Sequence, residues 1–290
     1  METLTNTFKE QIKQTVSMAK FSTVVTAENV YQEGNPAIVP ILDGMVDSLL
    51  LPGSGMEGLE NLEALLAKAE EGKSCLLLPE HYSNFDLSMI SLFARRAGGR
   101  GNAIADAIVA VAGMKLNEDN PIVAAYASAY TRIVVFRRGL EGLDPEKDQA
   151  ELIRSNAINR AAMKKLEEVK TQGKLILIFP AGTRFRPWDP STKRGVREVD
   201  SYIRTFDYMC LLSINGKILH IQESDMMNDV VCKDKVTVTV GPVLSCAEFR
   251  EKARAEAEAA GIEDKRQAAV DAVMTELNRM HDAAEEKRKK

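Results

Sequence analysis

The chain has 290 residues, of which 45% are hydrophobic and 28% charged, and its formal net charge is −4. This is the composition of a soluble globular protein long enough to bury a sizeable core, so stability does not require metals or disulfides. The negative net charge argues against a nucleic-acid partner, because proteins that bind nucleic acids usually present a basic surface. The four cysteines are dispersed without a C-x-x-C pair, which favours free thiols in a reducing compartment over a zinc site.

The first thirty residues mix charges of both signs and lack the uninterrupted apolar core of a signal peptide. The longest apolar stretch, residues 103–114, is interrupted by Asp106 and is too short to cross a bilayer. We therefore expect a cytoplasmic protein that is at most peripheral to the membrane, with transient contact at the membrane surface.

The N-terminal segment predicts helices, because Phe8, Ile12, Val16 and Ala19 recur three or four residues apart. The sequence LPGSGMEG then breaks this pattern. We place a domain boundary there, between a small helical N-terminal element (residues 1–55) and an α/β domain with C-terminal helices (residues 56–290).

Helices and short apolar strands alternate from Leu59 onward, which is typical of an α/β fold. The strand KLILIF shows no polar alternation, so it should be central in a covered sheet. The prediction is a mixed, mostly parallel central sheet with helices on both faces. The predicted elements are a helix at 59–71, a strand at 75–78, a helix at 87–96, a strand at 132–136, a helix at 150–171 and a strand at 174–179.

The last third of the chain predicts one alternating strand and a long helical tail. The segment KVTVTV, residues 235–240, alternates with a period of two and belongs near an edge of the sheet. Residues 247–290 are strongly helical and carry one apolar stripe, which predicts packing against the body; a membrane or a partner is the alternative. The stripe consists of Val270, Val273, Met274, Leu277 and Met280.

Two polar residues, His81 and Asp86, follow the strand that ends near Pro79. In a continuous helix, five steps of about 100° would leave their side chains roughly 140° apart. If the helix instead starts near Asn84 or Phe85, His81 lies in the loop and the Asp86 carboxylate in the first turn can reach the imidazole. In such a pair the aspartate orients the ring and the second ring nitrogen can accept a proton from a hydroxyl. The alternative is a histidine that caps a helix beside an incidental aspartate.

Arginines gather where other predicted strands end, and strand ends are where α/β proteins bind ligands. Arg137 and Arg138 end the strand RIVVF, and Arg184 and Arg186 follow KLILIF in the loop FPAGTRFRP. In a chain of negative net charge this placement indicates an anion site, most simply for phosphate, which the guanidinium fork suits. Solvated surface arginines are the alternative.

The three segments taken together resemble the glycerolipid acyltransferases. The pattern H-x-x-x-x-D at His81 and Asp86, then VVFRR at 134–138, then FPAGTR at 179–184 occur in that order, and VGPVL at 240–244 resembles the family's late region. The resemblance covers roughly residues 57–245. The family usually has asparagine and glutamate where this chain has Glu80 and Ala181.

The soluble plastid-type glycerol-3-phosphate acyltransferases also lack that glutamate, and their loop resembles PAGTRFRP. The resemblance therefore implies transfer of an acyl group from acyl carrier protein or a CoA thioester to glycerol 3-phosphate, without a cofactor or metal. It implies His81 as general base and Asp86 as the residue that orients it. The residues implied in substrate binding are Arg137, Arg138, Gly182, Thr183, Arg184 and Arg186.

Two other functions are compatible with the same residues. One is an acyltransferase that acts on lysophosphatidate at the membrane surface. The other is a non-catalytic relative that binds lipid or phosphate, with Glu80 and Ala181 as marks of lost activity. Acyl transfer to glycerol 3-phosphate without detergent would separate the predicted function from both.

Overall fold

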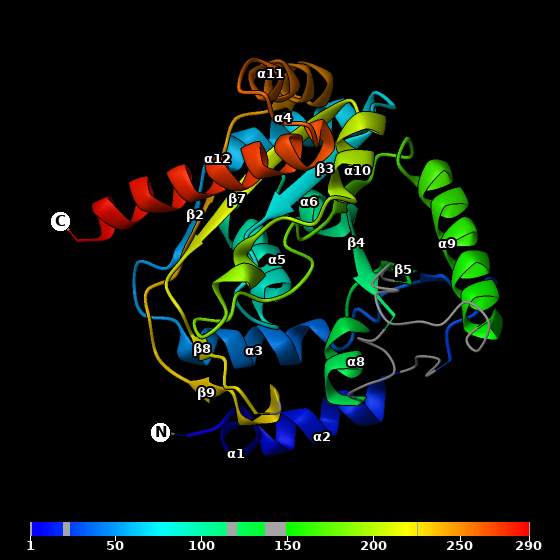
Figure 1. The fold of residues 1–290 in the computed structure, drawn as a ribbon. Coiled ribbons are helices and arrows are strands. Elements are labelled where there is room, and N and C mark those ends of the chain that lie inside the picture. Colours follow the sequence, from blue (N-terminus) through cyan, green and yellow to red (C-terminus); the bar gives the residue numbers. More distant parts are fainter. Residues whose placement is uncertain (1, 20–23, 115–120, 137–148, 225, 290) are drawn as a thin grey trace.

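The computed structural model describes residues 2–19, 24–114, 121–136, 149–224 and 226–289 (Figure 1). Within these ranges nine strands form one mixed sheet in the order β1-β5-β4-β6-β3-β7-β10-β2, with β11 paired to β7. The pairs joining β5, β4, β6, β3 and β7 are all parallel, which confirms the predicted fold class. The strands are β1 (Tyr31–Gln32), β2 (Gly55–Glu57), β3 (Cys75–Pro79), β4 (Ile108–Gly113), β5 (Arg132–Val135), β6 (Leu175–Leu177), β7 (Tyr208–Asn215), β10 (Thr237–Val240) and β11 (Leu244–Ser245).

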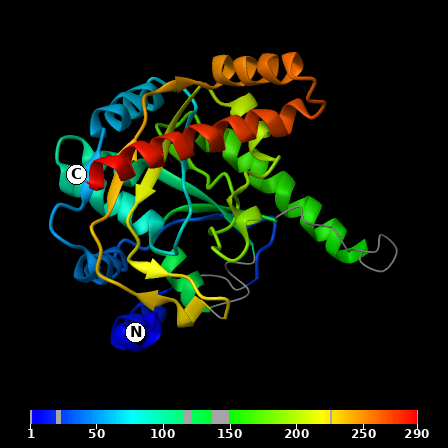
Figure 2. The same ribbon diagram turned by 60° about the vertical axis from the view of Figure 1, so that its left-hand side comes forward.

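Helices cover both faces of this sheet (Figures 1 and 2). One face carries a core shared by the N-terminal helices and those that follow β3. The other carries a second core under α9, α10 and the C-terminal helix. The helices of the first face are α1 (Leu4–Thr7), α2 (Lys9–Met18), α3 (Val39–Leu49), α4 (Leu59–Glu70), α5 (Asp86–Ala97), α6 (Gly101–Ala107) and α8 (Pro121–Ala127), and those of the second are α9 (Gln149–Val169), α10 (Val199–Thr205), α11 (Cys246–Ala259) and α12 (Lys265–Arg288).

Side-chain alternation along the central strands explains the two cores. In β3, Cys75 and Leu77 belong to the first core, whereas Leu76 and Leu78 belong to the second, and all four are fully buried. A strand buried on both faces needs no polar residue, which is why the apolar runs locate the centre of the sheet. β6, which lies within KLILIF, sits between β4 and β3 as predicted, and β10 lies next to the edge strand β2.

The C-terminal stripe packs inward, as predicted. Val270, Val273 and Leu277 of α12 are fully buried in the second core, and Met274 and Met280 are nearly so. Figure 2 shows α12 lying across the sheet near β7. This helix therefore completes the core, and its apolar face is covered by the body of the molecule.

Several elements have no counterpart among the predicted ones, among them α8, α10 and β7. The apolar stretch 103–114 also divides into the end of α6 and the strand β4. A small two-stranded sheet is formed by β8 (Leu219–His220) and β9 (Val230–Val231), and short 3-10 turns lie at Pro190–Lys193 and Met226–Asn228.

The proposed boundary at residue 55 stays a prediction. Leu42 and Met45 of α3 share the first core with Leu62 of α4, which lies beyond that boundary. No helix in the described parts of the chain combines the length and the hydropathy that crossing a bilayer needs.

Candidate active site

The loop after β3 brings His81 and Asp86 together. Nδ1 of His81 lies 2.8 Å from Oδ2 of Asp86, and α5 begins at Asp86 with Phe85 before it. The same carboxylate accepts hydrogen bonds from the backbone N–H groups of Tyr82 at 2.6 Å and Ser83 at 2.9 Å, and from the Ser83 hydroxyl at 2.8 Å. Asp86 is fully buried. The loop therefore holds the carboxylate rigidly beneath the imidazole.

This contact fixes what each ring nitrogen can do. An ionised carboxylate only accepts hydrogen bonds, so Nδ1 must be the protonated nitrogen and Nε2 keeps its lone pair. The ring also stacks on Phe179 at the end of β6, with the ring centroids 3.9 Å apart and the planes at 18°. The His81 side chain is 17% exposed, and in a neutral ring whose Nδ1 donates to Asp86 the Nε2 atom is the one that can accept a proton.

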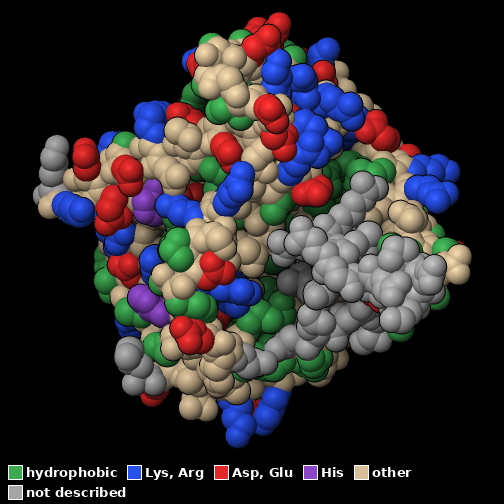
Figure 3. Space-filling view, viewed as in Figure 1, with side chains coloured by type: hydrophobic (Ala, Val, Ile, Leu, Met, Phe, Trp, Pro, Cys, Tyr) green, Lys and Arg blue, Asp and Glu red, His purple; other side chains and the backbone are tan. Residues whose placement is uncertain are grey.

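A cavity of about 1020 Å³ opens in front of His81. His81 and Phe179 belong to its wall, which runs from α5, β4 and α8 on one side of the sheet to α9, α10 and the loop after β6 on the other. Figure 3 shows Lys and Arg side chains gathered over α10 beside a hollow with hydrophobic side chains. Its apolar lining includes Val111, Val123, Val135, Met163, Leu166 and Ile178.

The loop after β6 contributes Gly182 and Thr183 to the wall of this cavity. Gly182 adopts a positive φ of 64°, and a Cβ there would meet the Val196 side chain at 3.3 Å, so the turn favours glycine. The loop is tied to the histidine, because the Phe185 N–H donates to the His81 carbonyl at 2.8 Å. The FPAGTR segment therefore borders the candidate base, as the motif order suggested.

Arg184 and Arg186, which the sequence predicts to bind an anion, are not among the described residues that line the cavity. Nη1 of Arg184 is 2.6 Å from Oδ2 of Asp229, which is fully buried, and the Arg184 side chain is only 16% exposed. Arg186 is exposed, in a tight turn closed by the Asp189 N–H donating to the Arg186 carbonyl. Arg137 and Arg138 lie outside the described residues.

The turn after Arg186 presents Trp188, whose side chain is 41% exposed. The base of the turn is held by the Arg186 N–H, which donates to Oγ1 of Thr192 at 2.8 Å. Thr192 is in turn part of the cavity wall. Trp188 is thus carried by the loop that borders the cavity and is rigidly connected to it.

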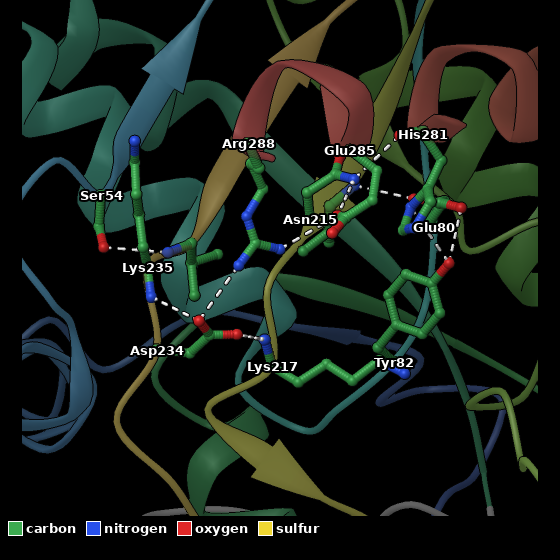
Figure 4. Close-up of polar contacts among 12 residues, drawn as sticks. Ser54, Glu80, Tyr82, Asn215, Lys217, Asp234, Lys235, His281, Glu285 and Arg288 are labelled. Atoms are coloured by element: carbon green, nitrogen blue, oxygen red, sulfur yellow. Dashed lines mark hydrogen bonds and ion pairs between the residues drawn. The ribbon is translucent and has the colours of Figure 1, made fainter. Parts of the chain in front are cut away.

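Sequence reasoning missed a polar network behind the histidine, which Figure 4 shows. Glu80, 4% exposed, accepts hydrogen bonds from the Tyr82 hydroxyl and from Nδ1 of His281 on α12, both at 2.8 Å. It also accepts one from the Ile214 N–H of β7 at 2.8 Å. Asn215 continues the network to α12 through the His281 carbonyl at 3.0 Å. Glu80, the residue before the candidate base, is therefore anchored to the C-terminal helix. The third histidine, His220, is exposed on β8.

None of the four cysteines is among the described residues that line the cavity. Cys75, Cys210 and Cys246 are fully buried, and burial raises the pKa of the Cys75 and Cys210 thiols to about 12. Cys232 is exposed. Among the described residues no three His, Cys, Asp or Glu side chains are grouped as metal ligands would be.

Comparison with known families places the chain in one of them. No curated protein matches the chain in a sequence comparison. The family model described as Acyltransferase matches residues 55–212, more than half of the 290 residues, and these include His81, Asp86, Phe179 and the loop after β6. The chain belongs to the acyltransferase family.

Proposed function

We propose that this acyltransferase esterifies glycerol 3-phosphate with an acyl group from acyl carrier protein or CoA. The observation that carries the proposal is the His81–Asp86 contact of 2.8 Å at the wall of a cavity of about 1020 Å³. A cavity of this size takes both a short acceptor and part of an acyl chain, and its apolar wall suits the chain.

In the proposed reaction, Nε2 of His81 takes the proton of the acceptor hydroxyl as its oxygen attacks the thioester carbonyl carbon. The C–O bond forms, the C–S bond breaks, and the leaving thiolate receives the proton from the imidazolium. Asp86 keeps Nδ1 protonated and stabilises the positive ring. General base assistance of this kind contributes around 10²- to 10⁴-fold, and orientation of the two substrates supplies more.

Gly182 and Thr183, which line the cavity, are proposed to border the acceptor. Arg137, Arg138 and Arg186 remain candidates for its phosphate. For Arg184 to bind the phosphate, the phosphate must either displace the Asp229 carboxylate from Arg184 or bind beside it. At the rim, Arg194 and Arg197 line the cavity and suit an anionic donor such as the phosphates of CoA or an acidic carrier protein.

The test is an assay of the purified chain with radiolabelled glycerol 3-phosphate and acyl thioesters of CoA and of acyl carrier protein, without detergent. We expect an acylated glycerol phosphate from at least one donor. Transfer only to lysophosphatidate would replace the proposed acceptor. Absence of transfer from both donors to both acceptors would leave a binding protein.

A further inference from the structure

Arg132, the first residue of β5, is buried with most of its donors unused. It is 2% exposed, and it is among the largest fully buried side chains of the protein. Nη1 donates to the Ala127 carbonyl at the end of α8 at 2.7 Å. Nε and Nη2 are buried without a hydrogen-bond partner in the described part of the chain. Burial lowers the pKa of Arg132 to about 10, so the group is still a cation at neutral pH.

The two unused nitrogens form one recognition edge. Nε and Nη2 lie side by side on a guanidinium, and together they make the two-donor fork that binds a carboxylate or a phosphate oxygen pair. An unpaired buried cation is costly, and native proteins rarely keep one without an anion nearby. The contact with Ala127 accounts for the third nitrogen but leaves this edge unexplained.

Arg132 belongs to the wall of the cavity that His81 also lines, and its Nε and Nη2 atoms are buried there. Tyr126 is another of the cavity-lining residues, and its hydroxyl is buried and also has no partner among the described residues. Arg132 is in register with Ala110 of β4, Ala110 with Leu177 of β6, and Leu177 with Leu77 of β3. Leu77 and Leu177 face the first core, so Arg132 is on the side of the sheet covered by α5 and α8.

The same register sets the separation from the candidate base. Three strand spacings of about 4.8 Å lie between the rows of β5 and β3, which puts these backbones about 14 Å apart. His81 lies four residues beyond Leu77, the β3 residue of that row, so up to about 13 Å along the strand direction adds to this separation. The two side chains thus line one cavity from positions too far apart for direct contact, and a ligand that contacts both must span the distance that remains between them.

We propose that the Nε–Nη2 edge of Arg132, with the hydroxyl of Tyr126 in α8, is the subsite that receives the oxyanion of a substrate held against His81. This deepens the proposed function and rests on it in one respect: if glycerol 3-phosphate is the acceptor, the oxyanion is its phosphate. The chemistry alone also admits a carboxylate, and the experiment below separates the two sources.

The first readout is thermal stability, which does not depend on activity. The melting temperature is measured against sodium phosphate, and separately against sodium succinate, at constant ionic strength set with sodium chloride. An anion that binds only the folded state raises it as the concentration exceeds the dissociation constant. We expect a saturable rise for the wild type, its loss in Arg132→Met, and a shift toward higher concentration in Tyr126→Phe.

Two further variants keep the test decisive. Arg204→Met removes an exposed arginine that lines the same cavity, and it should retain the full shift. Arg132→Lys retains the charge without the fork, and we expect at least about tenfold weaker binding of the anion. If Arg132→Met does not fold, Arg132→Lys and Tyr126→Phe still decide the matter. A shift that persists in the Arg132 variants, or no shift for either anion in the wild type, overturns the subsite.

The two anions and an assay identify the source. A shift with phosphate supports the phosphate ester, and a shift with succinate alone supports a carboxylate-bearing substrate and overturns the phosphate assignment. In the acylation assay, Arg132→Lys should raise KM for glycerol 3-phosphate by about tenfold or more with a smaller change in kcat. An Arg132-dependent shift without acyl transfer rejects the proposed function alone, whereas acyl transfer without the shift rejects the subsite alone.

Discussion

The loops after β3 and after β6 meet at the candidate base but are held in opposite ways. In the first, every partner of the Asp86 carboxylate lies within five residues of it. In the second, Arg184 is held by Asp229, which is 45 residues away. A short local contact can be anticipated from spacing, whereas a distant ion pair depends on the whole fold. The first loop therefore leaves the proposed base partly exposed, whereas in the second Arg184 is paired with a buried carboxylate.

The largest effect should come from the first loop. His81→Ala removes the proposed base and should lower kcat by about 10²- to 10⁴-fold. It also removes one of the hydrogen bonds to the buried Asp86 carboxylate, so we expect the free energy of unfolding to fall by about 1–2 kcal/mol. The measurement is initial-rate kinetics with saturating thioester. Wild-type turnover in this variant would exclude His81 as the base.

Asp86→Asn tests the orientation of the ring by the same loop. An amide can offer its NH₂ group to Nδ1 and so favour the other tautomer, with the proton on Nε2, where it cannot accept one from the acceptor. We expect kcat to fall about 10²-fold or more with KM little changed. A variant with wild-type kcat would show that the carboxylate serves only to start α5.

A substitution in the second loop should lower the stability of the folded protein. Arg184→Met removes a cation that pairs with the buried Asp229 carboxylate, and we expect the free energy of unfolding to fall by roughly 3 kcal/mol in urea titrations. The double variant Arg184→Met with Asp229→Asn should recover part of this loss, because both charges are gone. Unchanged stability together with a raised KM for glycerol 3-phosphate would instead assign Arg184 to the acceptor.

The anchor behind the first loop should have a smaller effect. His281→Phe removes one of the three hydrogen bonds to Glu80, and we expect a loss of about 1–2 kcal/mol in unfolding free energy. We also expect kcat to fall a few-fold, because the residue before the base loses its link to α12. His220→Phe, at an exposed position on β8, is the matched control and should change neither quantity.

The smallest expected change concerns the cysteines. Burial keeps Cys75, Cys210 and Cys246 protonated and inaccessible, so only Cys232 should react with an aromatic disulfide reagent in the native protein. All four thiols should react after denaturation. Blocking Cys232 should leave acyl transfer intact, and inactivation by that single modification would contradict a mechanism without a cysteine nucleophile.

The order of the elements and the His81–Asp86 contact could be predicted because both depend on short-range patterns. Apolar runs such as those containing β3 and β6 indicate buried strands, and five residues between two polar groups limit where a helix can start. The strand RIVVF was predicted as well, yet its register and the orientation of Arg132 depend on β4, whose sequence reads as a continuation of α6. The sequence feature that could have indicated a buried cation is the arginine that begins this otherwise apolar strand.

The long-range polar contacts could not be predicted. His281 lies 201 residues from Glu80, and no spacing rule connects a helix near one end of the chain to the residue before the candidate base. The same applies to Asp229 and Arg184. The Glu80–His281 pair forms because β3 and α12 both pack against β7, an arrangement that only the assembled sheet determines.

The turn that displays Trp188 offers a built-in optical reporter. It is the only tryptophan among the 290 residues, and indole emission responds to the polarity around the ring. Since the loop that carries it also borders the cavity, arrival of a donor or acceptor can be timed by stopped-flow fluorescence without attaching a dye. The order in which the two substrates enter is then open to direct kinetic observation.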